Sequence, residues 1–103
     1  MANYIDIDRL RTIWKGMRSR CSNPRDKSYR YYGERSIEVC EEWASFERFA
    51  GWAVVNGYSD AKEIDRIESD RHYEPGNCRW ISAKLNRSRR AVPGATRLAG
   101  EAR

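Results

Sequence analysis

The spacing of the apolar residues constrains this fold more than any other feature of the sequence. Five of them share one face at helical spacing early in the chain: Leu10, Ile13, Trp14, Met17 and Cys21. Asp6 or Asp8 can cap the start of this predicted helix, where a carboxylate also meets the positive end of the helix dipole. Residues 22–26 contain Pro24 among polar residues, which is typical of a turn after the helix.

A second helix is predicted over residues 42–56. Its apolar side is formed by Trp43, Phe46, Phe49, Ala50 and Ala53, which the spacing assigns to the core. Gly57 follows directly, and a glycine at this position ends a helix by adopting a left-handed conformation.

Three short strands are predicted, over residues 35–39, 62–68 and 78–81. The last two are separated by a polar turn and by a loop that contains Pro75 and Gly76. Ser82 suits the N-cap of a short basic helix over residues 83–90. The predicted fold class is therefore α+β, with a helical N-terminal half and short strands.

A chain of 103 residues has room for one domain, which we expect to span residues 1–92, with a basic, flexible tail over 93–103. No apolar run approaches the ~18 residues of a membrane helix. The first ten residues lack the basic and apolar regions of a signal peptide, so we expect a cytoplasmic protein. The three cysteines lie far apart, which favours reduced, buried thiols.

The net charge of +5 is unevenly distributed along the chain. Residues 9–35 hold nine Lys or Arg against two acidic residues, and residues 79–103 hold seven against one. Between them, residues 36–78 hold ten acidic residues against four basic ones. Two basic blocks around an acidic middle are typical of a nucleic-acid-binding protein with an acidic metal site, although a solvated surface of mixed sign gives the same counts.

The segment from Asp65 to Asn86 combines strand, loop, strand and helix in that order. A carboxylate on the first strand and a polar side chain on the helix can converge at one point. A carboxylate and an amide oxygen suit a hard cation such as Mg²⁺, which stabilises the charge that develops on a phosphate during hydrolysis.

Several motifs resemble those of small phage-encoded proteins of the HNH nuclease superfamily. The first is Trp-x-x-Met-x-x-Arg-Cys, over residues 14–21, and the second is Tyr-Gly-x-Arg-x-Ile-x-Val-Cys, over residues 32–40. They are followed by Glu-Trp at 42–43, Ile-Asp-Arg-Ile at 64–67 and Tyr-x-Pro-x-Asn-Cys-Arg-Trp at 73–80. The Asp-Arg pair, the loop and the helix Asn are also similar to those of a rare-cutting restriction endonuclease of this superfamily. The resemblance covers about residues 10–90 and implies a ββα-metal finger.

The resemblance also implies a role for each matching residue. Asp65 and Asn86 become the ligands of Mg²⁺ or Mn²⁺, and Asn77 becomes the residue that pins the loop. Arg66 stands where most relatives have the His that activates water. Because arginine stays protonated, it is a poor general base, but it can stabilise a phosphate or position a hydroxide.

The expected partner is DNA, which the protein would nick as a metal-dependent endonuclease of phage origin. Eight basic residues are candidates for DNA contacts: Arg18, Arg30, Arg35, Arg79, Lys84, Arg87, Arg89 and Arg90. Tyr31 and Tyr32 are candidates for an assisting tyrosine. Because one such site cuts one strand, a double-strand cut requires a homodimer or two successive binding events.

Two alternatives stay open at this point. The same fold can bind DNA, or a host protein as a phage inhibitor or anti-defence effector, without cutting, and Arg66 favours this reading. A structural Zn²⁺ on Cys21, Cys40, Cys78 and His72 is the other, but no two of these residues have the close spacing of a zinc knuckle.

Overall fold

A computed structural model describes residues 5–91 of the chain, and the side chains up to residue 88. The α-helices are α1 (Ile7–Ser22), α2 (Phe46–Val55) and α3 (Ala83–Ala91), and the strands are β1 (Lys62–Arg66) and β2 (Cys78–Ser82). Short 3₁₀ helices are η1 (Tyr29–Tyr31), η2 (Gly33–Arg35), η3 (Glu41–Ala44) and η4 (Pro75–Asn77). The fold class is α+β, as predicted. The predicted tail over 93–103 and the domain boundary at 92 lie outside the described residues.

The first helix forms as its apolar pattern predicts. The Asp6 side chain caps α1 by accepting from the backbone N–H of Arg9 at 3.1 Å. Leu10 and Met17 are fully buried. Trp14 is half-buried, and its indole N–H donates to the Trp43 carbonyl oxygen at 2.8 Å, which ties α1 to η3.

The predicted helix over 42–56 is divided by Ser45. Residues 41–44 form η3, and α2 starts only at Phe46. The physical reason is local, because the Ser45 hydroxyl accepts from the Arg48 backbone N–H at 3.3 Å and so acts as a new N-cap. Gly57 does adopt the predicted left-handed conformation after α2, with φ of 94°.

The strand predicted over 35–39 is wrong. Residues 33–35 form η2, Ser36 has a positive φ of 65°, and the segment makes only an isolated parallel bridge between Val39 and Tyr73. The apolar side chain of Ile37 is nevertheless buried, since this segment packs on the core without pairing as a strand.

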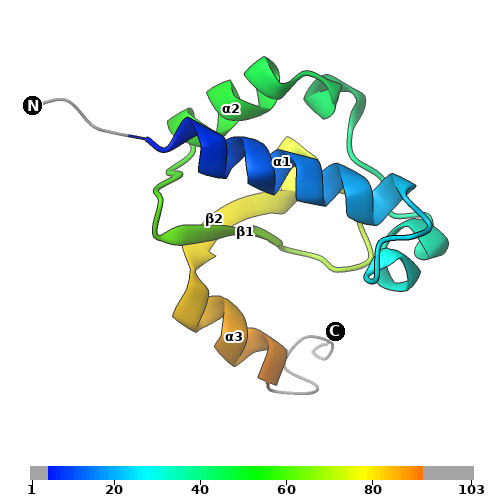
Figure 1. The fold of residues 1–103 in the computed structure, drawn as a ribbon. Helices are drawn as coiled ribbons and strands as arrows, with labels where there is room; N and C mark the ends of the chain where they lie inside the picture. The colour runs from blue at the N-terminus through cyan, green and yellow to red at the C-terminus, as the bar shows by residue number, and fades with distance from the viewer. Residues whose placement is uncertain (1–4, 92–103) are drawn as a thin grey trace, which may run out of the picture.

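The two strands form an antiparallel sheet that separates two sides of the molecule. Ile64 pairs with Trp80 and faces the core, together with α1 and α2. Glu63 pairs with Ile81, and Asp65 pairs with Arg79, so these residues face the other side, because side chains alternate along a strand. Figure 1 shows α1 and α2 on one side of the strands and α3, in orange, on the other.

No helix within residues 5–91 is long and apolar enough to cross a membrane.

Candidate functional site

Asp65 is the fourth of the five residues of β1 and faces the side of the sheet on which α3 lies. Its Oδ2 accepts from the Arg79 Nε at 3.0 Å across the strand pair. The Asp65 side chain is only 11% exposed, whereas that of Arg79 is 43% exposed. The Asp65 carboxylate is thus largely buried, and the Arg79 guanidinium that it binds is partly exposed to solvent.

Asn86 lies one turn into α3 and is 3% exposed. Its Nδ2 donates to the Glu63 Oε1 at 2.8 Å. Ser82 is the N-cap of α3, as the sequence predicts, because its hydroxyl accepts from the Leu85 backbone N–H at 3.1 Å. The Asn86 amide is therefore held against the same face of β1 that carries Asp65, and its partner on that strand is Glu63.

Glu63 is a residue of this candidate site that the sequence prediction missed. Its signal is the alternation of side chains along a strand, which places residues 63 and 65 on one face. The bond to Asn86 depends on how α3 leaves β2, and the sequence pattern does not give that angle.

The donor atoms on this face suit the cation that the HNH resemblance implies. Asp65 offers a carboxylate oxygen and Asn86 offers an amide oxygen, while the Glu63 Oε1 accepts from the Asn86 Nδ2. Mg²⁺ is held through oxygen atoms of one or two carboxylates plus water and phosphate. Over the described part of the chain, no group of three or more His, Cys, Asp or Glu side chains could hold a metal ion. A cation here would accordingly be held by the Asp65 carboxylate and the Asn86 amide, with water and phosphate as its other ligands.

Arg66 is not brought together with Asp65, because adjacent residues of a strand point to opposite faces. Its guanidinium carbon lies 4.9 Å from the centre of the Tyr32 ring and 5.3 Å from that of Tyr73. Its Nη1 donates to the carbonyl oxygens of Ser69 and Arg71. In this position Arg66 holds the chain that follows β1 against two tyrosines.

Asn77 is the most thoroughly bonded side chain of the loop between the strands. It is 1% exposed, and its Oδ1 accepts from the Glu68 backbone N–H at 2.9 Å. Its Nδ2 donates to the carbonyl oxygens of Glu68, at 3.1 Å, and His72, at 3.0 Å. These bonds fix the loop across its width, which is the geometry that the predicted pinning role requires.

The basic candidates fall into two groups. Arg79, Lys84 and Arg87 are exposed on β2 and α3, around the candidate site. Arg18, Arg30 and Arg35 lie on α1, η1 and η2. In Figure 1, η1 and η2 lie at the C-terminal end of α1, well away from α3. The side chains of Arg89 and Arg90 lie outside the described residues.

The second basic group is largely engaged within the protein. Arg35 forms an ion pair with Asp70 at 3.2 Å, and Arg30 donates to the Tyr31 hydroxyl at 2.9 Å. Tyr31 is exposed, whereas Tyr32 is half-buried and stacks on Tyr73. Of the two tyrosine candidates, Tyr32 is thus the one beside Arg66.

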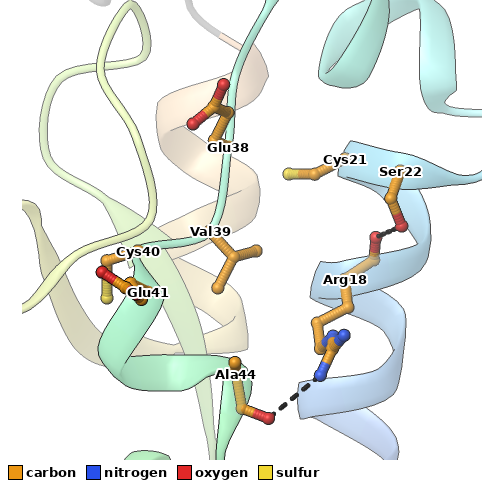
Figure 2. Close-up of a pocket in the computed structure, with 8 residues that line it drawn as sticks. All are labelled: Arg18, Cys21, Ser22, Glu38, Val39, Cys40, Glu41 and Ala44. Atoms are coloured by element: carbon orange, nitrogen blue, oxygen red, sulfur yellow. Dashed lines mark hydrogen bonds between the residues drawn. The ribbon is translucent and has the colours of Figure 1, made fainter.

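Arg18 lines a shallow hollow of about 280 Å³ between α1 and the segment 38–44. Figure 2 shows Arg18 and Cys21 on the α1 wall and Val39 and Cys40 on the opposite wall, with the Arg18 Nη1 donating to the Ala44 carbonyl oxygen at 3.1 Å. Among the residues that line the hollow, Arg18 is a predicted DNA contact, and Cys21 and Cys40 belong to the alternative zinc set.

The three cysteines and His72 are the residues of the alternative zinc set. All three cysteines are free thiols. Burial raises the pKa of Cys21 to about 11 and that of Cys78 to about 12. His72 is exposed, and its Nδ1 accepts from the Glu38 backbone N–H at 3.0 Å.

The chain matches no family model, no curated protein and no solved structure. The resemblance to the HNH superfamily therefore rests on the sequence motifs.

Proposed function

We propose that this protein is a divalent-cation-dependent DNA endonuclease with a ββα-metal finger of the HNH type, which nicks one strand at a time. The observation that carries the proposal is the arrangement of β1, β2 and α3. It holds the Asn86 amide and the Asp65 carboxylate on one face of a two-stranded sheet. The order of elements along the chain, which is β1, loop, β2 and α3, is the order that the motifs predict, and this supports the proposal.

Each residue then has a task that its position allows. Asp65 and Asn86 hold Mg²⁺ or Mn²⁺, which supplies Lewis-acid stabilisation of the phosphate charge. The exposed cations Arg79, Lys84 and Arg87 contact DNA phosphates beside them. Phosphate contacts fix the register of the duplex without reading its sequence.

Arg66, at the end of β1, and Asn77, in η4, support the site by holding the loop between the strands. Arg66 bonds to the Ser69 and Arg71 carbonyls, and Asn77 bonds to Glu68 and His72. Together they fix both ends of the chain between β1 and β2. The role of Arg66 is accordingly to hold the loop from the opposite face of β1, and it does not act as a base.

Nicking of supercoiled plasmid in Mg²⁺ or Mn²⁺ tests this function. Wild type and Asp65→Asn are compared, with EDTA as the metal-free condition. Asp70→Asn is the matched control, because Asp70 carries the same group in the neighbouring loop and pairs with Arg35 in solvent. Wild type and Asp70→Asn should nick the plasmid, while Asp65→Asn and the EDTA sample should not. Equal nicking by Asp65→Asn, or none by wild type in either metal, contradicts the proposal.

A DNA-binding module that does not cut is the second candidate. The specific observation that favours it is the ion pair between Asp65 and Arg79, which already satisfies the carboxylate with a protein cation. In this case wild type and Asp65→Asn bind DNA equally and neither nicks it. Binding that is insensitive to salt would exclude phosphate contacts and direct attention to a protein partner.

A further inference from the structure

We propose that Glu63 is a positioning residue that orients the Asn86 amide, so that its carbonyl oxygen is presented to the cation on the Asp65 face. The inference rests on the proposed function and deepens it by one residue that no motif marks. Glu63 acts through Asn86 and does not itself touch the ion.

The chemistry of the amide carries the first step. An Asn side chain has a donor at one end and an acceptor at the other, and only the acceptor end can bind a cation. An ionised carboxylate accepts hydrogen bonds and donates none. The Glu63 Oε1, 2.8 Å from the Asn86 Nδ2, therefore selects the orientation in which Nδ2 faces Glu63 and Oδ1 faces away from it.

The rigidity of the surroundings carries the second step. Asn86 is 3% exposed, so its side chain has little room to adopt another rotamer. Lys62 pairs with Ser82, and α3 begins at the next residue, so strand and helix are joined without a loop. A ligand that projects from such elements, held by a second residue, keeps its geometry better than a ligand on a loop.

Binding of Mn²⁺ to the free protein, followed by electron paramagnetic resonance titration, tests the inference without DNA or cleavage. The variants are Glu63→Ala, Glu63→Gln, Asn86→Ala and the double variant Glu63→Ala/Asn86→Ala. Glu42→Ala is the matched control, because it removes the same charge from an exposed position on η3. Circular dichroism confirms that each variant is folded.

A positioning role predicts a distinct pattern of affinities. Glu63→Ala should weaken Mn²⁺ binding about 10- to 100-fold, the usual effect of losing a residue that orients a metal ligand. Glu63→Gln keeps a carbonyl oxygen that accepts from Asn86, so its affinity should stay within about threefold of wild type. In the Asn86→Ala background, Glu63→Ala should have no further effect, because it acts through that residue.

Three outcomes overturn the inference. If Glu63→Gln weakens binding as much as Glu63→Ala does, Glu63 acts through its charge or as a direct ligand. If both variants bind like wild type, Glu63 is structural only. If the effects of Glu63→Ala and Asn86→Ala add, the two residues act independently. A wild type that binds Mn²⁺ with the predicted pattern but leaves plasmid intact would instead retain the inference and reject the endonuclease.

Discussion

At Asp65, the Arg79 guanidinium that it holds in the structure competes with the cation that the proposed function requires, because both are positive. Arg79→Ala should therefore bind Mn²⁺ about two- to fivefold more tightly than wild type, because a partly exposed ion pair contributes roughly 0.5–1 kcal/mol. The same variant should bind DNA more weakly, since a phosphate contact is lost.

The two effects of Arg79→Ala have opposite signs, which makes them easy to separate by a Mn²⁺ titration and a DNA-binding titration on one sample. Arg71→Ala is the control, because its ion pair with Glu74 lies in the loop and involves no proposed ligand. A Mn²⁺ affinity that is unchanged or lower in Arg79→Ala would show that Arg79 does not compete for the carboxylate.

The buried amide of Asn77 should contribute strongly to the stability of the protein, because it forms three hydrogen bonds within the loop. Asn77→Asp keeps the shape and the acceptor for Glu68 N–H, but it replaces two donated bonds with repulsion between a carboxylate and two carbonyl oxygens. We expect a loss of about 3 kcal/mol in the free energy of unfolding, measured with urea. Asn56→Asp, at the exposed end of α2, should lose less than about 1 kcal/mol. Similar losses in both variants would contradict the role given to Asn77.

The site was only partly predictable from single residues. The order of elements in the sequence suggested that Asp65 and Asn86 could converge, and the resemblance to the HNH superfamily supplied their roles and that of Asn77. The partners of Asp65 and Asn86 could not be predicted, because Arg79 reaches Asp65 through the strand register and Glu63 reaches Asn86 through the angle of α3. The separation of Arg66 from Asp65 follows from alternation along the strand, but its tyrosine partners come from distant segments.

The helices and strands were easier to predict than their ends. The apolar spacing identifies α1 and α2 because each buries one face in a single core. It extends α2 too far, because Ser45 competes for the backbone N–H of Arg48 and starts the helix anew. Alternation at 35–39 suggests a strand, but η2 and the positive φ of Ser36 leave this segment without a strand partner beyond one bridge.

Two glycines, Gly33 in η2 and Gly51 in α2, should respond oppositely to substitution by alanine. A Cβ on Gly33, in η2, would lie 2.5 Å from the Cys21 carbonyl oxygen and collide with the Tyr29 ring. Gly33→Ala should lower the free energy of unfolding by about 3 kcal/mol. On α2, a Cβ on Gly51 meets no atom within 4 Å, so Gly51→Ala should raise it by about 0.5–1 kcal/mol. Thermal or urea unfolding measures both, and equal signs would contradict the packing of η2 against α1.

The folded protein as a whole should lose stability in alkaline solution through the buried thiol of Cys78 and the half-buried thiol of Cys21. The pKa of Cys78 is about 12 and that of Cys21 about 11, whereas the ordinary value is 9.0. Below pH 9 both thiols are protonated in the folded and unfolded chain alike. From pH 9 to about 12 the unfolded chain loses these protons first, so the free energy of unfolding falls as the pH rises.

Urea unfolding of wild type and Cys78→Ala at pH 8 and pH 10.5, with a reductant present, measures this effect. Other titrating groups contribute to both proteins, so the variant should lose less stability than wild type between the two pH values. An identical loss in both proteins would show that the Cys78 thiol is not protected by the core.

The central claim is that β1 and α3 together hold a divalent cation, and nuclear magnetic resonance with small additions of Mn²⁺ tests it most directly. The paramagnetic ion should broaden the backbone amides of Glu63 and Asp65 and the side-chain amide of Asn86 first. The side-chain amide of Asn23, at the C-terminal end of α1, should stay sharp, and EDTA should restore every signal. Broadening that begins at Asn23 or near the acidic residues of η3, with Asn86 unchanged, would contradict the account.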